Sequence, residues 1–448
     1  MNDRRSDRVS NPPVTDLIRR LRTVAVSPPA RAGYGLSIAS YLQATLGLGI
    51  SFYLANRLGP EQYGLLSYGL VIGTVIYTCV NFGAERTLVR DLVQSRDPHG
   101  VMTASLVLRG VLALLMLGAV GGYLAVAELE SDRRLVILFC SVAAIFWAGN
   151  PVSWFDSRYQ MHKQALITLA EKFVYGFMVL VTFGTRGTAT IATAALFLMI
   201  SRGLSQALQL FVARRTWRVE SARLSAHLRW LVAGNRTIVL AALASLFISH
   251  WNQLLLEHRL STERLGYYAL AFQMIAVVTL FQNQIVRVFL PRVARIVNEN
   301  SDSGMARRRL RQYAALSSLL SLALVVPLAA IAPFVLDRFF APAYAQALAP
   351  FRVLCVWVVY YGGARLVNAF TLGLRLDRPY LWSSLAAGAT AVLLGLMLVP
   401  RHGEVGVALA LLFSHPVTTA AEWFFIEREF ARRDARQDRS SMEVTEHA

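Results

Sequence analysis

Runs of about 20 apolar residues recur along the whole chain, and short charged segments separate them. A helix of that length crosses a hydrocarbon core of roughly 30 Å. In lipid, each backbone polar group has to be bonded within its own helix or within a closed barrel. The runs are too long and too uniformly apolar for barrel strands. The chain is therefore expected to be an all-α integral membrane protein.

Twelve such runs can be assigned as membrane spans. The first six cover residues 34–56, 64–83, 102–127, 134–155, 164–183 and 188–212, and the second six cover 234–257, 264–286, 312–336, 350–373, 380–399 and 404–426. An even number of spans places both termini on one side of the membrane. The chain then divides into an N-terminal segment 1–33, a first six-helix lobe 34–212, a linker 213–233, a second six-helix lobe 234–426 and a tail 427–448.

The distribution of charge gives the orientation. A net charge of +18 raises the question of a nucleic-acid partner. Of the 45 basic residues, however, roughly 32 fall on one side of the membrane and about 9 on the other. This asymmetry follows the positive-inside rule, so the charge is a topological signal and no nucleic-acid partner is expected. Both termini are expected in the cytoplasm, with the spans in a bacterial inner membrane.

The linker and the tail differ in pattern. The linker reads ARRTWRVESARLSAHLRWLVA, and its apolar residues Trp217, Leu224, Leu228 and Leu231 would share one side of an amphipathic helix. The tail is charged and Ser-rich without apolar periodicity, so we expect it to be disordered.

An internal repeat relates the two lobes. Residues 57–64 read RLGPEQYG and residues 259–266 read RLSTERLG, so four residue types recur with one offset of 202: Arg57, Leu58, Glu61 and Gly64 at Arg259, Leu260, Glu263 and Gly266. The same offset carries Arg90 onto Arg292. Both lobes therefore begin alike and in parallel orientation, a pattern typical of transporters that hold their substrate between two copies.

The segment RLGPEQYG, followed by a span that ends in NFGAERTLVRDL (81–92), resembles the opening of the polysaccharide biosynthesis and O-antigen flippase (Wzx-type) family of the MOP exporter superfamily. The resemblance implies two six-helix lobes in a V around a central cavity. It implies a flippase that moves a polyprenyl-pyrophosphate-linked oligosaccharide from the cytoplasmic to the periplasmic leaflet by alternating access. The product would be O-antigen, capsule or exopolysaccharide, and the partners would be membrane lipids and the polysaccharide polymerase and export machinery.

Four cations lie inside expected spans and are candidate substrate-binding residues: Arg109, Lys172, Arg202 and Arg365. Each costs several kcal/mol if it faces lipid. All four lie toward the expected cytoplasmic ends, where a cavity would first receive a diphosphate, and arginine can bind phosphate oxygens bidentately. The alternative for each is that the side chain reaches the headgroups or bonds a neighbouring helix.

Amide side chains at membrane depth could bond sugar hydroxyls, or could equally bond other helices. They are Gln43, Asn81, Asn150, Asn252, Gln253, Gln273, Gln282 and Asn283.

The sequence contains no Walker A loop, GxSxG, HExxH or clustered CxxC motif. We therefore predict no catalytic residue, metal or cofactor, and a protein that is not an enzyme. Two alternatives stay open. A membrane-embedded polysaccharide polymerase or ligase usually needs a long periplasmic loop, whereas the expected outer loops are short. A cation-coupled small-molecule or drug antiporter of the same superfamily usually needs buried carboxylates, and Glu171 is the clear one within a span.

Overall fold

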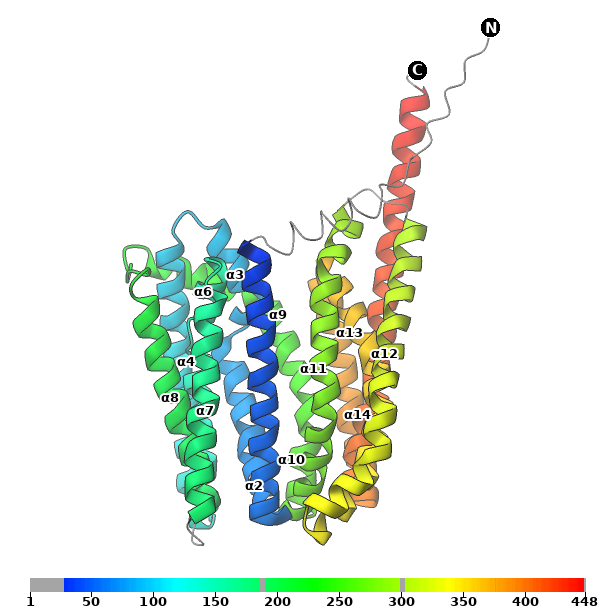
Figure 1. The fold of residues 1–448 in the computed structure, drawn as a ribbon. Coiled ribbons are helices and arrows are strands. Elements are labelled where there is room, and N and C mark those ends of the chain that lie inside the picture. Colours follow the sequence, from blue (N-terminus) through cyan, green and yellow to red (C-terminus); the bar gives the residue numbers. More distant parts are fainter. Residues whose placement is uncertain (1–27, 186–189, 299–302, 375, 447–448) are drawn as a thin grey trace.

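The computed structural model describes residues 28–185, 190–298, 303–374 and 376–446, and this part of the chain is helical without a strand. The helices form two bundles that stand side by side (Figure 1). Helix α2 begins and α14 ends at the same face, which we call the terminal face; the opposite face is the distal face. Most of the expected segment 1–33 lies outside the described residues.

The first bundle contains α2 (Pro28–Asn81), α3 (Ala84–Gln94), α4 (Pro98–Val126), α5 (Ser131–Ala148), α6 (Val152–Ser157), α7 (Met161–Thr185) and α8 (Ile191–Ala213). The second contains α9 (Leu224–Leu246), the π-helix η1 (Phe247–Trp251), α10 (Asn252–Arg259), α11 (Thr262–Asn298), α12 (Ser303–Phe339), the 3-10 helix η2 (Pro342–Ala347), α13 (Leu348–Gly373) and α14 (Asp377–Glu446).

Ten helical stretches of the described chain are long and apolar enough to cross a membrane. Two of them are each divided at a glycine, α2 at Gly59 (φ 75°) and α14 at Gly403 (φ 58°). A positive φ is open to glycine at little cost, so the chain turns there without a long loop. The described chain thus contains twelve segments of spanning length, and the predicted all-helical membrane fold is confirmed.

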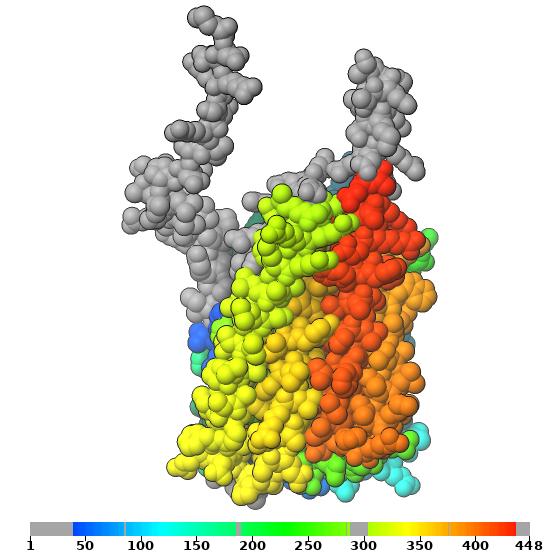
Figure 2. All heavy atoms as spheres, turned by 90° about the vertical axis from the view of Figure 1, so that its right-hand side faces the viewer, coloured from blue at the N-terminus to red at the C-terminus, as the bar shows by residue number. Residues whose placement is uncertain are grey.

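Each bundle has an apolar core and turns other apolar side chains outward. The first core includes Val136, Cys140 and Val179, and the second includes Leu256 and Phe351. Figure 2 shows α12 and α14 on the outer surface of the second bundle. Large apolar side chains on these two helices are exposed and would face lipid: Leu319, Val326, Phe334, Leu393, Met397 and Phe413.

The linker is helical only from Leu224 onward, where it runs directly into α9. The preceding residues are held in another conformation because Arg218 donates its backbone N–H to His99 Nδ1 (3.1 Å) and the Trp217 indole donates to the His99 carbonyl (3.4 Å). The expected amphipathic helix is therefore corrected to a shorter one. Leu224, Leu228 and Leu231 of this helix, and Trp217 before it, pack on a first-bundle cluster that includes Leu88.

The tail is helical as far as Glu446, which corrects the expected disorder for residues 427–446; the last two residues of the expected tail lie outside the described residues. Arg307 of α12 pairs with Glu427 (2.8 Å) and Asp434 (3.4 Å). Phe430 is buried beside them, with 3% of its surface exposed. Two carboxylates of the tail are thus paired with a distant helix, and its first turns have an apolar contact.

Asp97 caps α4 and holds the linker. Its Oδ1 accepts the Gly100 N–H (2.8 Å), and its Oδ2 lies 3.0 Å from His227 Nε2 of α9. The Gly100 N–H and then His227 lower the pKa of Asp97 below its ordinary value of 3.8. A carboxylate with a lowered pKa stabilises the fold above its unfolded pKa, and that contribution is lost as pH falls through the folded value.

We therefore expect Asp97→Ala to reduce the stability of the purified chain by about 1 kcal/mol at pH 7, because a helix cap is lost. The difference in thermal unfolding between wild type and variant should shrink as pH falls below 3.8. A difference that stays constant to pH 3 would contradict this role for the ionised carboxylate.

Candidate functional site

A cavity of about 530 Å³ lies between the two bundles. Both segments of α2, together with α7 and α8, line it from the first bundle, and η1, α10 and α11 line it from the second. The cavity is thus built at the interface of the two halves that the sequence repeat relates.

The wall from the first bundle is cationic. Lys172 on α7 and Arg202 on α8 both line the cavity. The Arg202 guanidinium lies 5.0 Å from the ring centroid of Trp147, and Lys172 Nζ lies 3.6 Å from Glu171 Oε1. No acidic side chain is among the described lining residues. The structure therefore brings two of the four predicted cations into one cavity. Glu171 balances part of the Lys172 charge, and the remaining positive charge at Arg202 would favour an anion.

The wall from the second bundle is polar and aromatic without a permanent charge. It presents His250, Gln253 and Gln273 beside Phe272. The Gln253 amide donates to the Ser249 carbonyl (2.8 Å), which leaves its Oε1 able to accept. This wall offers hydrogen bonds of the kind that sugar hydroxyls use.

Arg109 lies elsewhere, which corrects the expectation that it faces the cavity. It is buried on α4, with 4% of its surface exposed, and its Nη1 donates to the carbonyls of Ala148 and Asn150, both at 3.0 Å. These carbonyls stand at the C-terminal end of α5, where helix carbonyls lack intrahelical partners and attract a cation. Arg109 thus has a structural task within the first bundle.

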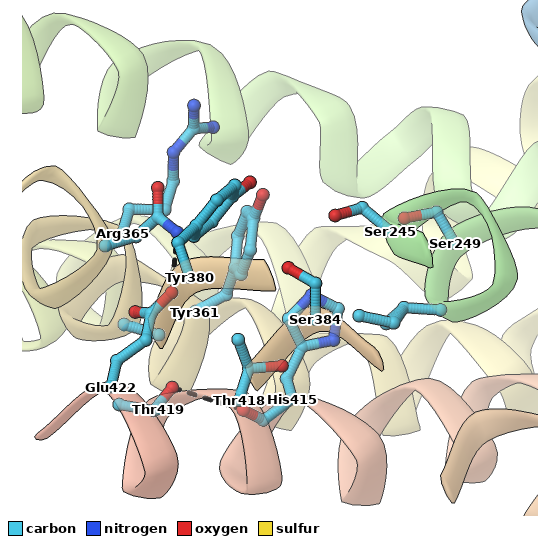
Figure 3. Close-up of a pocket in the computed structure, with 13 residues that line it drawn as sticks. Ser245, Ser249, Tyr361, Arg365, Tyr380, Ser384, His415, Thr418, Thr419 and Glu422 are labelled. Atoms are coloured by element: carbon cyan, nitrogen blue, oxygen red, sulfur yellow. Dashed lines mark hydrogen bonds between the residues drawn. The ribbon is translucent and has the colours of Figure 1, made fainter. Parts of the chain in front are cut away.

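Arg365 lines a second, smaller pocket of about 200 Å³ inside the second bundle (Figure 3). Its guanidinium lies 5.4 Å from the Tyr361 ring centroid. Figure 3 places Arg365 and Glu422 toward one end of the pocket and Ser249 toward the other. The structure therefore does not bring Arg365 into the cavity that holds Arg202.

The π-helix η1 lies between the cavity and the smaller pocket. Ser249 lines the smaller pocket, and the next residue, His250, lines the cavity. A π-helix inserted in an α-helix often marks a functional position. The hydropathy of the span 234–257 gives no sign of this change of helix type, so the sequence analysis missed it.

Glu422 was also missed. It is buried on α14, with 1% of its surface exposed, and accepts a hydrogen bond from Asn368 (2.8 Å). Because Glu422 lies within the expected span 404–426, the sequence could have identified it as a second carboxylate inside a span, in addition to Glu171.

Comparison with known proteins places this geometry in context. A family model described as polysaccharide biosynthesis protein matches residues 32–297. Among curated proteins, none matches the chain by sequence.

Solved transporter structures share the fold. The Lipid II flippase MurJ in an inward closed conformation has a TM-score of 0.67 and 12% identity, with 89% of each chain covered. An inward-facing multidrug resistance MATE transporter of the MOP superfamily has a TM-score of 0.66 and 15% identity over 88% of this chain and 96% of that one. A MOP superfamily transporter from Pyrococcus furiosus has a TM-score of 0.64 and 14% identity over 91% of this chain and 97% of that one.

The geometry of Arg109 predicts a stability effect. Replacing it with Leu removes a charged donor from two carbonyls and should cost about 2 kcal/mol. Thermal unfolding of the purified chain in detergent should show a clear loss for Arg109→Leu and a smaller one for Arg202→Leu. Equal losses would contradict the structural task of Arg109.

Proposed function

Because the chain belongs to the polysaccharide biosynthesis protein family, we propose that it is a flippase for a polyprenyl-pyrophosphate-linked oligosaccharide. It moves this lipid from the cytoplasmic to the periplasmic leaflet for synthesis of a surface polysaccharide. The observation that carries the proposal is the pair of cations, Lys172 and Arg202, in a cavity between two bundles with no acidic residue among its described lining.

The charge arrangement suits a lipid diphosphate. A diphosphate that crosses roughly 30 Å of hydrocarbon needs counter-charges along the way, and Arg202 is a cation in the cavity that can supply one. Arg202 can bind phosphate oxygens with its planar fork, while Lys172 adds a point charge. The sugars would then lie against Gln253 and Gln273 of the second bundle.

The surface charge supports a proposed orientation in the membrane. The terminal face carries exposed arginines of the linker, including Arg214, Arg215 and Arg223. By the positive-inside rule this face lies in the cytoplasm of a bacterial inner membrane, and the distal face lies in the periplasm. A polysaccharide polymerase and the export machinery would receive the cargo there.

The likeness in fold to MATE transporters favours one second candidate, a cation-coupled antiporter of small molecules. A cavity wall with Lys172 and Arg202 would repel a cationic cargo. The cavity charge therefore favours the lipid diphosphate.

Deletion of the gene in its native host tests the proposal directly. We expect the completed lipid-linked repeat unit to accumulate in the cytoplasmic leaflet while surface polymer is lost, because synthesis continues without translocation. Lipid extraction of the polyprenyl-pyrophosphate pool, combined with a membrane-impermeant sugar-modifying reagent, measures the amount and the leaflet.

Complementation with the wild-type gene is the control. Accumulation in the outer leaflet would point to a polymerase or ligase instead, and unchanged lipid and polymer pools would point to the antiporter.

Substitutions of the cavity cations test the site. We expect Lys172→Ala and Arg202→Ala each to reduce export by about tenfold or more, since each removes a charge-assisted contact with the diphosphate. Arg338→Ala, at an exposed arginine at the end of α12, is the matched control and should export normally. Export is measured as surface polymer per amount of protein in the membrane.

Arg365→Ala tests whether the substrate uses the smaller pocket as well as the cavity. If the substrate uses only the cavity, this variant should keep more export than Arg202→Ala. Normal export by the Lys172→Ala, Arg202→Ala double variant would contradict the site.

A further inference from the structure

Helices α2 and α11 cross at the distal end of the molecule. Gly64 of α2 contacts α11 there, and Gly266 of α11 contacts α2. A Cβ atom placed on Gly64 would lie 1.9 Å from the Thr262 carbonyl oxygen, and one on Gly266 would lie 1.9 Å from the Pro60 carbonyl oxygen. The offset of 202 that relates Gly64 to Gly266 also relates Pro60 to Thr262. The two copies of the repeat therefore meet in a pseudo-twofold contact.

Only glycine fits this crossing. Real Cβ atoms essentially never approach another heavy atom closer than 3.0 Å, and the obstacle at each position is a backbone carbonyl, which cannot rotate away as a side chain can. An added methyl group would have to push the backbones of α2 and α11 apart by roughly the 1 Å that separates 1.9 Å from 3.0 Å. Since both helices are packed into bundles, such a movement is transmitted to the bundles themselves.

Polar contacts join the bundles around the same crossing. Arg133 of α5 forms an ion pair with Glu257 of α10, and the Arg133 guanidinium also lies 5.1 Å from the ring centroid of Tyr68. The Tyr344 hydroxyl of η2 donates to the Ala55 carbonyl of α2 at 3.0 Å. Both contacts run from one bundle to the other.

Apolar packing closes the remaining space at the distal end. Ala55 and Tyr63 of α2 belong to the core cluster of the second bundle, together with Tyr267. The rings of Phe52 and Phe340 meet edge to face with centroids 5.7 Å apart. The distal end is therefore closed by a continuous core, and cargo in the cavity cannot leave there until that core separates.

Nearer the terminal face, an aromatic pair joins the described parts of the same two helices. Tyr41 of α2 meets Phe281 of α11 with ring centroids 5.7 Å apart, and 42% of the Phe281 surface is exposed. Between this pair and the glycine crossing, α2 and α11 line the cavity.

We propose that the Gly64–Gly266 crossing is the seal of a distal gate and that the Arg133–Glu257 pair is its latch. The seal depends on the absence of two Cβ atoms, so a single methyl group at either glycine shifts the molecule toward a conformation that is open at the distal face. The proposal does not depend on which cargo the cavity takes.

Distances between spin labels on the purified full-length chain test the gate. The native cysteines are first replaced by serine. One label pair at Glu130→Cys and His402→Cys reports the distal face, and a second at Tyr159→Cys and Arg308→Cys reports the terminal face; each pair has one label on each bundle. Double electron–electron resonance measures both distance distributions.

In the Gly64→Ala and Gly266→Ala variants we expect the distal distribution to shift to longer distances and the terminal distribution to shorter ones, and by similar amounts because the contact is pseudo-symmetric. Gly406→Ala is the matched control. Its Cβ would meet the Leu398 carbonyl at 2.4 Å, within the second bundle alone, and should leave both distributions unchanged.

Unchanged distributions in folded, monodisperse Gly64→Ala and Gly266→Ala would overturn the proposal, as would the same shift in Gly406→Ala. If the glycine variants do not fold, Glu257→Gln tests the gate instead, because it removes the ion pair with Arg133 without adding volume. It should move both distributions in the directions given above, and unchanged distances in that variant would also overturn the gate.

Discussion

The hydrocarbon interior of a bilayer offers no hydrogen-bond partner, and this constraint decides how the chain can turn. Each span keeps its backbone bonded within its own helix. Within the described residues, the breaks at Gly59 and Gly403 both occur near the distal face, where one span ends and the next begins. Because glycine reverses the chain there within a residue or two, these two connections stay short.

The second constraint is the close approach of α2 and α11. Two repeat copies that meet through Gly64 and Gly266 bring their backbones nearer than any side chain would permit. With the distal ends fixed in this way, the α2 and α11 residues nearer the terminal face become opposite walls of one cavity. The duplication that was visible in the sequence thus explains both where the cavity lies and why each bundle supplies one wall.

The all-helical membrane fold could be predicted because the length and spacing of apolar runs are local properties of the sequence. The sequence predicted four cations for the cavity, and of these Lys172 and Arg202 line it whereas Arg109 and Arg365 do not. Depth in the membrane can be counted along a helix, but the direction of a side chain depends on its neighbours. Arg109 faces the end of α5, a contact 39 residues away in sequence. The helical tail was missed for the same reason, since its partner Arg307 lies on another helix.

The position of the cations has a consequence for transport by rocking bundles. Arg202 contacts Trp147 of α5, and Lys172 contacts Glu171 of its own helix, so both contacts lie within the first bundle. A rigid movement of one bundle against the other leaves such contacts unbroken. An anion held by this wall would keep its partners while the facing wall of His250, Gln253 and Gln273 moved relative to it. The cations would therefore hold the charge throughout the cycle, and the changing contacts would be the weaker hydrogen bonds on the second bundle, which keeps the barrier to movement low.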